Sequence, residues 1–187
     1  MEMSKERLVA FTDAVIAIIM TILILELKKP AVLTWAAVLD LRMNFFAYMI
    51  SFFWIGTMWV NMHCAWDHVK KINNKLVWIS LLLLFFASFF PYTTSIVADN
   101  FNSSVAQTLY GVVVLLVSFT NVWMYAELAK VADNKRSQTI SKNHNRMMSW
   151  DIIIKLVGMM LTLTIFPAGV MLAVLVTAVF IILPRSL

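Results

Sequence analysis

The chain has 187 residues, of which 61% are hydrophobic and only 13% are charged, and its mean hydropathy is +0.84. Soluble domains contain roughly 45–50% apolar and about 25% charged residues, so this composition excludes a soluble globular protein and indicates an integral membrane protein. The net charge of +5 comes from basic residues in short segments between apolar runs, a pattern typical of membrane orientation signals and not of a nucleic-acid-binding surface.

Apolar segments long enough to cross a bilayer as helices of about 20 residues recur along the chain. The sequence predicts four such spans, at residues 8–27, 44–66, 76–98 and 105–129. Residues 130–149 form the longest polar stretch, which we interpret as an exposed loop or a helix extension. The last apolar run is too long for one span, and Pro167, Ala168 and Gly169 signal a turn in its middle. We therefore predict two short helices there, at residues 150–166 and 169–184.

The predicted fold class is an all-α membrane protein with six transmembrane helices in one domain, residues 1–187. Most of the 15 Lys and Arg residues lie in the N-terminal tail, the second-to-third connection, the fourth-to-fifth region and the C-terminal tail. The third-to-fourth and fifth-to-sixth connections carry none. The positive-inside rule then predicts that both termini are cytoplasmic.

The motifs of several enzyme and binding classes are missing from the sequence. There is no P-loop, zinc motif, nucleophile elbow or dinucleotide fingerprint, and four glycines are too few for a phosphate cradle. The three histidines do not form a ligand pair at helical spacing, so we expect no metal site and no cofactor. The potassium-channel filter sequence T-V-G-Y-G is also missing, so helix side chains would have to form any ion path.

The first span contains the most informative residues. Arg7 and Asp13 are charged residues at the start of a membrane segment, where a charge is costly and suggests a functional role, so a buried network between helices is expected. Further along, three aliphatic residues at i, i+4 and i+7 share one stripe, with a threonine hydroxyl beside it: Ile18, Ile22, Leu25 and Thr21. In the fifth span, Asp151 and Lys155 are predicted to form an ion pair at the start of the helix.

Arg7, Phe11, Thr12 and Asp13, followed by an isoleucine-rich run, resemble the Arg-x-x-x-Phe-Ser-Asp signature of the endolysosomal potassium-channel family, in its bacterial branch. The similarity continues in later segments: Trp59 to His63, Trp78 and the turn Phe89-Phe90-Pro91-Tyr92. Two positions depart from the family pattern, since Thr12 replaces the usual Ser and Ser80 stands where Asn is usual.

The resemblance implies a potassium-permeable channel without the usual filter, in which the first helix of each repeat lines a central pore. A single six-span repeat implies a homotetramer, here in a bacterial inner membrane, whose partners are its own copies and membrane lipid. By the same resemblance, Ile18 narrows the pore, Ile22 and Leu25 extend the apolar constriction, and Thr21 supplies a hydroxyl layer. The implied network that holds the pore helix consists of Arg7, Phe11, Thr12, Asp13 and His63.

Other classes of function are compatible with the residues. A secondary transporter would show pairs of discontinuous helices, whereas only the last predicted hairpin is broken here. A membrane-embedded enzyme would need convergent catalytic groups at bilayer depth, and only Asp13 and His63 are candidates, so we do not expect an enzyme. A structural partner subunit without conduction is the third alternative.

Overall fold

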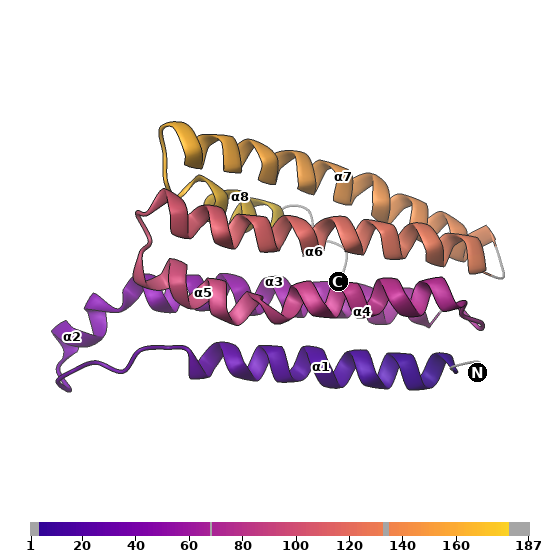
Figure 1. Cartoon of the computed structure of the whole chain (residues 1–187), viewed down its shortest axis with the longest axis horizontal. Coiled ribbons are helices and arrows are strands. Elements are labelled where there is room, and N and C mark those ends of the chain that lie inside the picture. Colours follow the sequence, from indigo (N-terminus) through magenta and orange to yellow (C-terminus); the bar gives the residue numbers. More distant parts are fainter. Residues whose placement is uncertain (1–3, 68, 133–134, 180–187) are drawn as a thin grey trace.

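Long antiparallel helices run side by side along one direction in the computed structural model, which describes residues 4–67, 69–132 and 135–179 (Figure 1). The connection between α3 and α4 lies at the same end as the start of α1, and α2 lies at the opposite end (Figure 1). The eight helices of the described residues are α1 Lys5–Leu25, α2 Trp35–Asp40, α3 Arg42–Trp66, α4 Asn74–Ser88, α5 Phe90–Asp99, α6 Ser104–Val131, α7 Lys135–Thr164 and α8 Gly169–Thr177.

Five segments of the described residues are long and apolar enough to cross a membrane: Lys5–Leu25, Arg42–Trp66, Asn74–Asp99, Ser104–Val131 and Gln138–Thr164. They overlap the first five predicted spans in order, but the fifth segment begins at Gln138, twelve residues before the predicted start at residue 150. The sixth predicted span, residues 169–184, begins where α8 begins, but its part beyond residue 179 lies outside the described residues. The count of six spans therefore stays a prediction.

The third span is broken into two helices, so the expectation that only the last hairpin is broken was wrong. α4 ends at Ser88 and α5 begins at Phe90, with Pro91 in its first turn. Proline has no N–H to donate, and its ring excludes the carbonyl of the preceding turn, which breaks a helix at this place. The hydroxyl of Thr93 lies 3.1 Å from the Phe89 carbonyl and 3.3 Å from that of Phe90, so both oxygens accept hydrogen bonds near the break.

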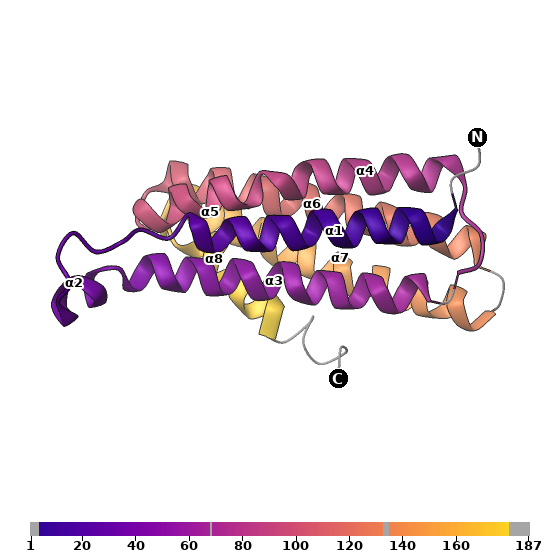
Figure 2. The ribbon, with the colours of Figure 1, turned by 90° about the horizontal axis from the view of Figure 1, so that it is seen from below.

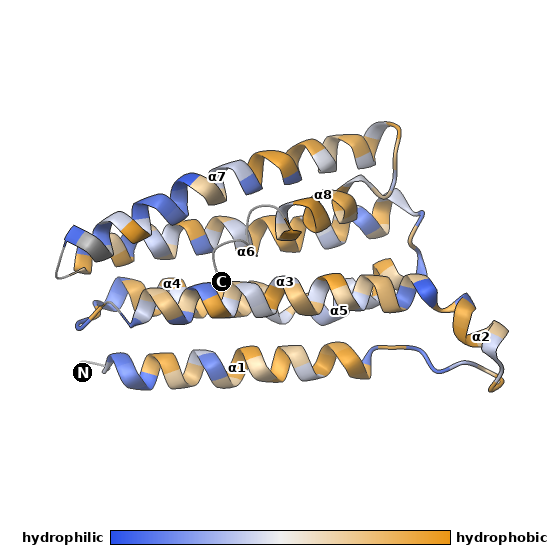
Figure 3. Cartoon of the chain, turned by 180° about the vertical axis from the view of Figure 1, so that it is seen from behind, coloured by the Kyte–Doolittle hydropathy of each residue, from blue (hydrophilic) through white to orange (hydrophobic). Residues whose placement is uncertain are grey.

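Two connections contain more helix than a simple loop. The segment between the first two spans carries α2, whose N-cap Thr34 accepts a hydrogen bond from the backbone N–H of Ala37 at 3.2 Å. The polar stretch at residues 135–149 is a helix extension, because α7 is continuous from Lys135. Figure 3 shows that the first part of α7 is mostly hydrophilic and its second part mostly hydrophobic. This contrast fits a helix that leaves the apolar layer at one end.

The turn predicted at Pro167 to Gly169 is confirmed, and it joins α7 to α8. The Thr162 hydroxyl donates to the Pro167 carbonyl at 3.0 Å and accepts from the Val170 N–H at 3.0 Å, which joins the two sides of the turn. Glycine is required for the close packing of this hairpin. A Cβ on Gly158 would lie 2.8 Å from the Gly169 carbonyl oxygen, and one on Gly169 would lie 2.7 Å from that of Gly158.

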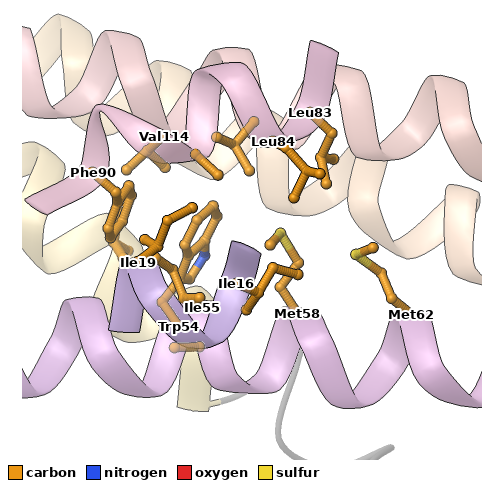
Figure 4. Close-up of a cluster of buried hydrophobic side chains, with 14 of the residues drawn as sticks. Ile16, Ile19, Trp54, Ile55, Met58, Met62, Leu83, Leu84, Phe90 and Val114 are labelled. Carbon is orange, nitrogen blue, oxygen red and sulfur yellow. The ribbon is translucent and has the colours of Figure 1, made fainter. Parts of the chain in front are cut away.

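The core lies between α3, α4, α5 and α6, and α1 covers one side of it. Trp54 of α3 stacks on Phe90 of α5, with ring centroids 5.0 Å apart. Ile16 and Ile19 of α1 point into the same cluster (Figure 4). Seen from below in Figure 2, α1 lies in front of the bundle, between α3 and α4. It packs on α3, α4 and α5, so the described residues cover only one side of α1.

Candidate functional site

The two faces of α1 differ sharply in exposure. The residues on the face toward the bundle are almost fully buried: Leu8, Thr12, Ile16, Ile19 and Leu23. On the opposite face, the exposed fractions are 57% for Ile18, 38% for Ile22 and 78% for Leu25. We call Ile18, Thr21, Ile22 and Leu25 the α1 stripe. The stripe predicted from the sequence therefore lies on the uncovered face of α1, whereas an ordinary core stripe would face the bundle.

Thr21 adds a polar layer to this apolar surface. Its side chain is exposed, and its hydroxyl donates a hydrogen bond to the Ile18 carbonyl of the same helix at 2.8 Å. Because the proton is used within the helix, the lone pairs of the oxygen are left as acceptors on the outer surface. An oxygen in this state suits a cation better than an anion.

Asp13 connects α1 to α3. Its carboxylate accepts a hydrogen bond of 2.7 Å from the indole Nε1 of Trp59. The Trp59 ring in turn stacks on His63, with centroids 5.7 Å apart, and His63 Nε2 lies 3.9 Å from the Asp67 carboxylate. The structure therefore brings two of the predicted network residues into contact with Trp59: Asp13 at the indole N–H and His63 against the ring face.

The other three predicted network residues make no interhelical hydrogen bond in the part of the chain that the structure describes. Thr12 is buried, but its hydroxyl donates to the Leu8 carbonyl of its own helix at 2.8 Å. Phe11 is 50% exposed, and Arg7 is exposed with no hydrogen bond or ion pair to its guanidinium among these residues. Sequence reasoning named Trp59 only as part of a motif and missed it as the partner of Asp13. The sequence did contain a signal for this contact, because Trp59 lies in the span that follows the one with Asp13 and carries an N–H that can donate to a carboxylate.

An open groove of about 360 Å³ runs beside this contact, between α1 and α3. It is lined by Asp13, Ile16, Ala17, Met20, Gly56 and Trp59.

Ser80, which replaces the asparagine usual in the family, lies on α4, is fully buried, and donates to the Leu76 carbonyl at 2.9 Å. It therefore takes no part in the contact between α1 and α3.

The segment that follows α1 is held at the other end of the bundle. Lys28 Nζ lies 2.8 Å from Asp99 Oδ2 at the end of α5, and Asn44 Nδ2 of α3 donates to Asp99 Oδ1 at 2.9 Å. Asp99 thus holds the linker and the first turn of α3 together. Together with the hydrogen bond between Trp59 and Asp13, these contacts fix α1 to the bundle near the middle of the helix and just beyond its end.

The predicted ion pair of Asp151 and Lys155 is confirmed, with Nζ and Oδ2 2.6 Å apart, but its predicted place was wrong. Since α7 begins at Lys135, the pair lies in the middle of the helix, and the exposed fractions of the two side chains are 0% and 1%. The Ser118 hydroxyl of α6 lies 3.1 Å from Lys155 Nζ and 3.4 Å from Asp151 Oδ2. Local sequence could not reveal this depth, because it depends on where α7 begins and on which helices cover it.

These features define a multi-pass helical membrane protein whose first helix has an uncovered apolar face with a hydroxyl layer. The sequence model of the family described as endosomal/lysosomal potassium channel TMEM175 matches residues 7–91. A second model, described only as a protein of unknown function (DUF3611), matches residues 72–184.

The chain is also similar in sequence to curated proteins that are named as ion channels. A protein of Chryseobacterium sp. named as a potassium channel is 39% identical over 110 residues, which cover 59% of this chain and 57% of that protein. The chain thus spans less than two thirds of this relative. A Chamaesiphon minutus protein with the same type of name is 30% identical over 154 residues, or 74% of this chain and 76% of that protein. The human protein, named as an endosomal/lysosomal proton channel, is 32% identical over 101 residues, 48% of this chain and 20% of that protein.

The chain belongs to the TMEM175 family. Its fold is similar to the crystal structure of a TMEM175 homologue from Chamaesiphon minutus, described as a lysosomal potassium-selective channel. The TM-score is 0.83, the identity 23%, and the superposition covers 97% of both chains. This similarity supports the bundle architecture described above.

Proposed function

We propose that this chain is the subunit of a potassium-permeable channel, in which the α1 stripe lines the pore. The observation that carries the proposal is that Ile18, Thr21, Ile22 and Leu25 share the face of α1 that the bundle leaves uncovered. The names of the two bacterial relatives support potassium as the permeant ion. The family signature of Arg7, Phe11, Thr12 and Asp13 belongs to the same proposal, with no cofactor or bound metal required.

The pore requires several copies of the chain, because one helix face cannot enclose a passage. A homotetramer of six-span subunits is proposed, since each chain supplies one pore helix. Four Ile18 side chains would form an apolar ring that controls conduction by dewetting, and Ile22 and Leu25 would extend it. The Thr21 oxygens would lie between these rings and offer acceptor lone pairs to a partly dehydrated cation. We expect weaker discrimination against sodium than a filter of backbone carbonyls provides.

The residues around Asp13 are proposed to hold the pore helix in position. Asp13 and Trp59 fix α1 to α3, with His63 stacked behind the indole. Arg7 and Phe11 are exposed in the single chain and are therefore placed to contact a neighbouring subunit. The channel is proposed to lie in a bacterial inner membrane with both termini in the cytoplasm.

Proton conduction is the second candidate, because the human relative is named as a proton channel. The secondary-transporter alternative gains little from the broken third span. The carbonyl of Phe85 accepts from Ser88 at 2.7 Å, and those of Phe89 and Phe90 accept from Thr93, so these oxygens are already used within the helices. A transporter would instead leave the backbone carbonyls of its unwound segment available to coordinate an ion.

The test measures potassium flux into proteoliposomes that contain the purified protein, with a potassium ionophore as the reference for full equilibration. We expect passive flux for the wild type and a higher flux for Ile18→Asn, because a polar ring removes the dewetting barrier. The matched control is Ile24→Asn. Ile24 is 48% exposed on the same helix, but six positions from Ile18 correspond to an angle of about 120° around the axis.

Equal effects of the two variants would contradict the assignment of the α1 stripe. Flux of protons but not of potassium, read with an internal pH dye, would favour the second candidate. Uptake against a potassium gradient that requires a proton gradient would favour the transporter. Intact oligomers of wild type and Ile18→Asn without any flux would favour a structural subunit.

A further inference from the structure

A second open groove lies at the surface of the bundle, between α4 and α6. These two helices run side by side (Figure 1). The groove has a volume of about 390 Å³, and apart from one lysine its walls are aromatic and aliphatic side chains. Its lining comes mainly from α4 and includes Lys75, Trp78, Leu82 and Phe85, with Trp123 from α6. We call it the α4–α6 groove.

The cation at one end of this groove is only partly compensated within the chain. Lys75 Nζ lies 3.6 Å from Glu127 Oε2, which is too far for a hydrogen bond. The same oxygen accepts a hydrogen bond of 2.9 Å from Lys130 Nζ, and Asn73 Nδ2 donates to the other carboxylate oxygen at 3.0 Å. One carboxylate therefore faces two ammonium groups. This end of the groove carries one positive charge in excess, and its lysine has N–H groups that can donate to an anion.

The tryptophans of the groove lie at the same end as the lysine. Trp78 follows Lys75 by about one turn of α4 and is largely exposed, and the centroid of the Trp123 ring lies 6.0 Å from Lys75 Nζ. Tryptophan is enriched at the headgroup level of membranes, where its apolar ring and its polar N–H both find partners. Lys70 and Lys71, both exposed, lie in the connection that leads into α4. These residues indicate that the lysine end of the groove lies at the membrane–water interface.

The length of the groove matches the depth of one leaflet. Lys75, Trp78, Leu82 and Phe85 follow one another at steps of three or four residues, so they lie on one face of α4. The distance from position 75 to position 85 corresponds to about 15 Å along the helix axis. Because the hydrocarbon core of a bilayer is about 30 Å thick, the groove reaches from the interface to about the bilayer middle. This is the depth that an acyl chain of one leaflet occupies.

Charge, and not the apolar wall, decides which lipid such a groove prefers. An acyl chain that enters the groove leaves surroundings that are as apolar as the wall, so its transfer discriminates little between lipids. The headgroup is different, because a zwitterionic lipid carries its own cation beside the phosphate, whereas an acidic lipid carries a net negative charge. Basic pockets between membrane helices bind acidic headgroups for this reason.

We propose that the α4–α6 groove binds one acidic phospholipid, from the leaflet at the end of the bundle where α1 begins. The lipid phosphate pairs with the Lys75 ammonium, the headgroup lies beside Trp78 and Trp123, and one acyl chain lies along Leu82 and Phe85. The site does not depend on potassium conduction, because its residues belong to α4 and α6 and not to the α1 stripe.

The test measures lipid binding to the purified protein in detergent by native mass spectrometry. Phosphatidylglycerol and phosphatidylcholine with identical acyl chains are added as an equimolar mixture, and the bound molecules of each are counted per chain. The charge variant is Lys75→Gln, which keeps a polar side chain but removes the cation. Its matched control is Lys142→Gln, which removes the same charge from an exposed lysine of α7 that does not line the groove.

We expect the wild type to bind phosphatidylglycerol about fivefold more strongly than phosphatidylcholine, the factor that one lysine at a membrane surface contributes. Lys75→Gln should lose this preference, and Lys142→Gln should keep it. A wild type without preference, or equal preferences in the two variants, would overturn the proposal.

The apolar part of the groove is tested with Leu82→Trp, whose larger side chain fills the space. We expect this variant to lose one bound phosphatidylglycerol per chain, whereas Val157→Trp, at an exposed position of α7 outside the groove, should keep it. The same spectra give the number of subunits. A changed subunit number in Leu82→Trp without loss of lipid would mean that a second copy of the chain covers the groove, and would overturn the proposal. Size-exclusion profiles identical to that of the wild type verify that the four variants are folded.

Discussion

The hydrogen bond from Trp59 to Asp13 offers a direct test of how the proposed pore helix is held. The change is Trp59→Phe, which keeps an aromatic ring but removes the indole N–H that lies 2.7 Å from the carboxylate. Asp13 is half-buried at the contact of α1 and α3, and it has no other hydrogen-bond donor among the described residues. The substitution therefore leaves a carboxylate without its donor.

The expected cost follows from the type of bond. A short hydrogen bond to a charged group contributes about 1.5–3 kcal/mol, and Asp13 keeps some contact with water through the open groove, so the lower half of this range applies. For a chain of this size, about 1.5–2 kcal/mol corresponds to a decrease in Tm of roughly 3–8 °C. Because the bond ties α1 to α3, the proposed function predicts altered potassium flux as well.

The measurement is a thermal melt of the purified protein beside potassium flux in proteoliposomes. The control is Trp78→Phe, which removes the same indole N–H from a residue of α4 that is 71% exposed and donates no hydrogen bond within the described residues. A Tm change for Trp59→Phe no larger than that of the control would refute the assigned strength of the bond. A lower Tm with unchanged flux would separate the stability of α1 from its role in conduction.

Two further predictions concern the packing of α7. Asp151→Asn should destabilise the protein by about 3–5 kcal/mol, because Lys155 is left as an unpaired buried charge. The double variant Asp151→Asn with Lys155→Met should cost clearly less, because it contains no buried charge at this place. Additive effects of the two substitutions in thermal melts would contradict this prediction. Gly158→Ala should cost about 1–3 kcal/mol, since its Cβ would lie 2.6 Å from that of Ala173. Gly56→Ala, where the nearest atom is Met20 Cε at 3.5 Å, is the control, and equal Tm values for these two variants would refute the close-packing argument.

The membrane class and the positions of the spans could be predicted from the sequence because hydropathy is a property of each segment by itself. The first, second and fourth spans lie where the apolar runs lie, and the turn at Pro167 follows from local backbone chemistry. The break before Pro91 has a local cause as well, although the apolar run continues through it. The spacing also showed that Ile18, Ile22 and Leu25 share one face of a helix.

Only the tertiary structure decided which way that face points, because the answer depends on the side of α1 that α3, α4 and α5 cover. The same holds for the partner of Asp13, which is 46 residues away in the chain. It holds too for Lys155, whose spacing from Asp151 predicted the pair but not its complete burial under α6 and Trp54. Contacts between distant segments arise from packing, and no local pattern encodes how deep a side chain lies.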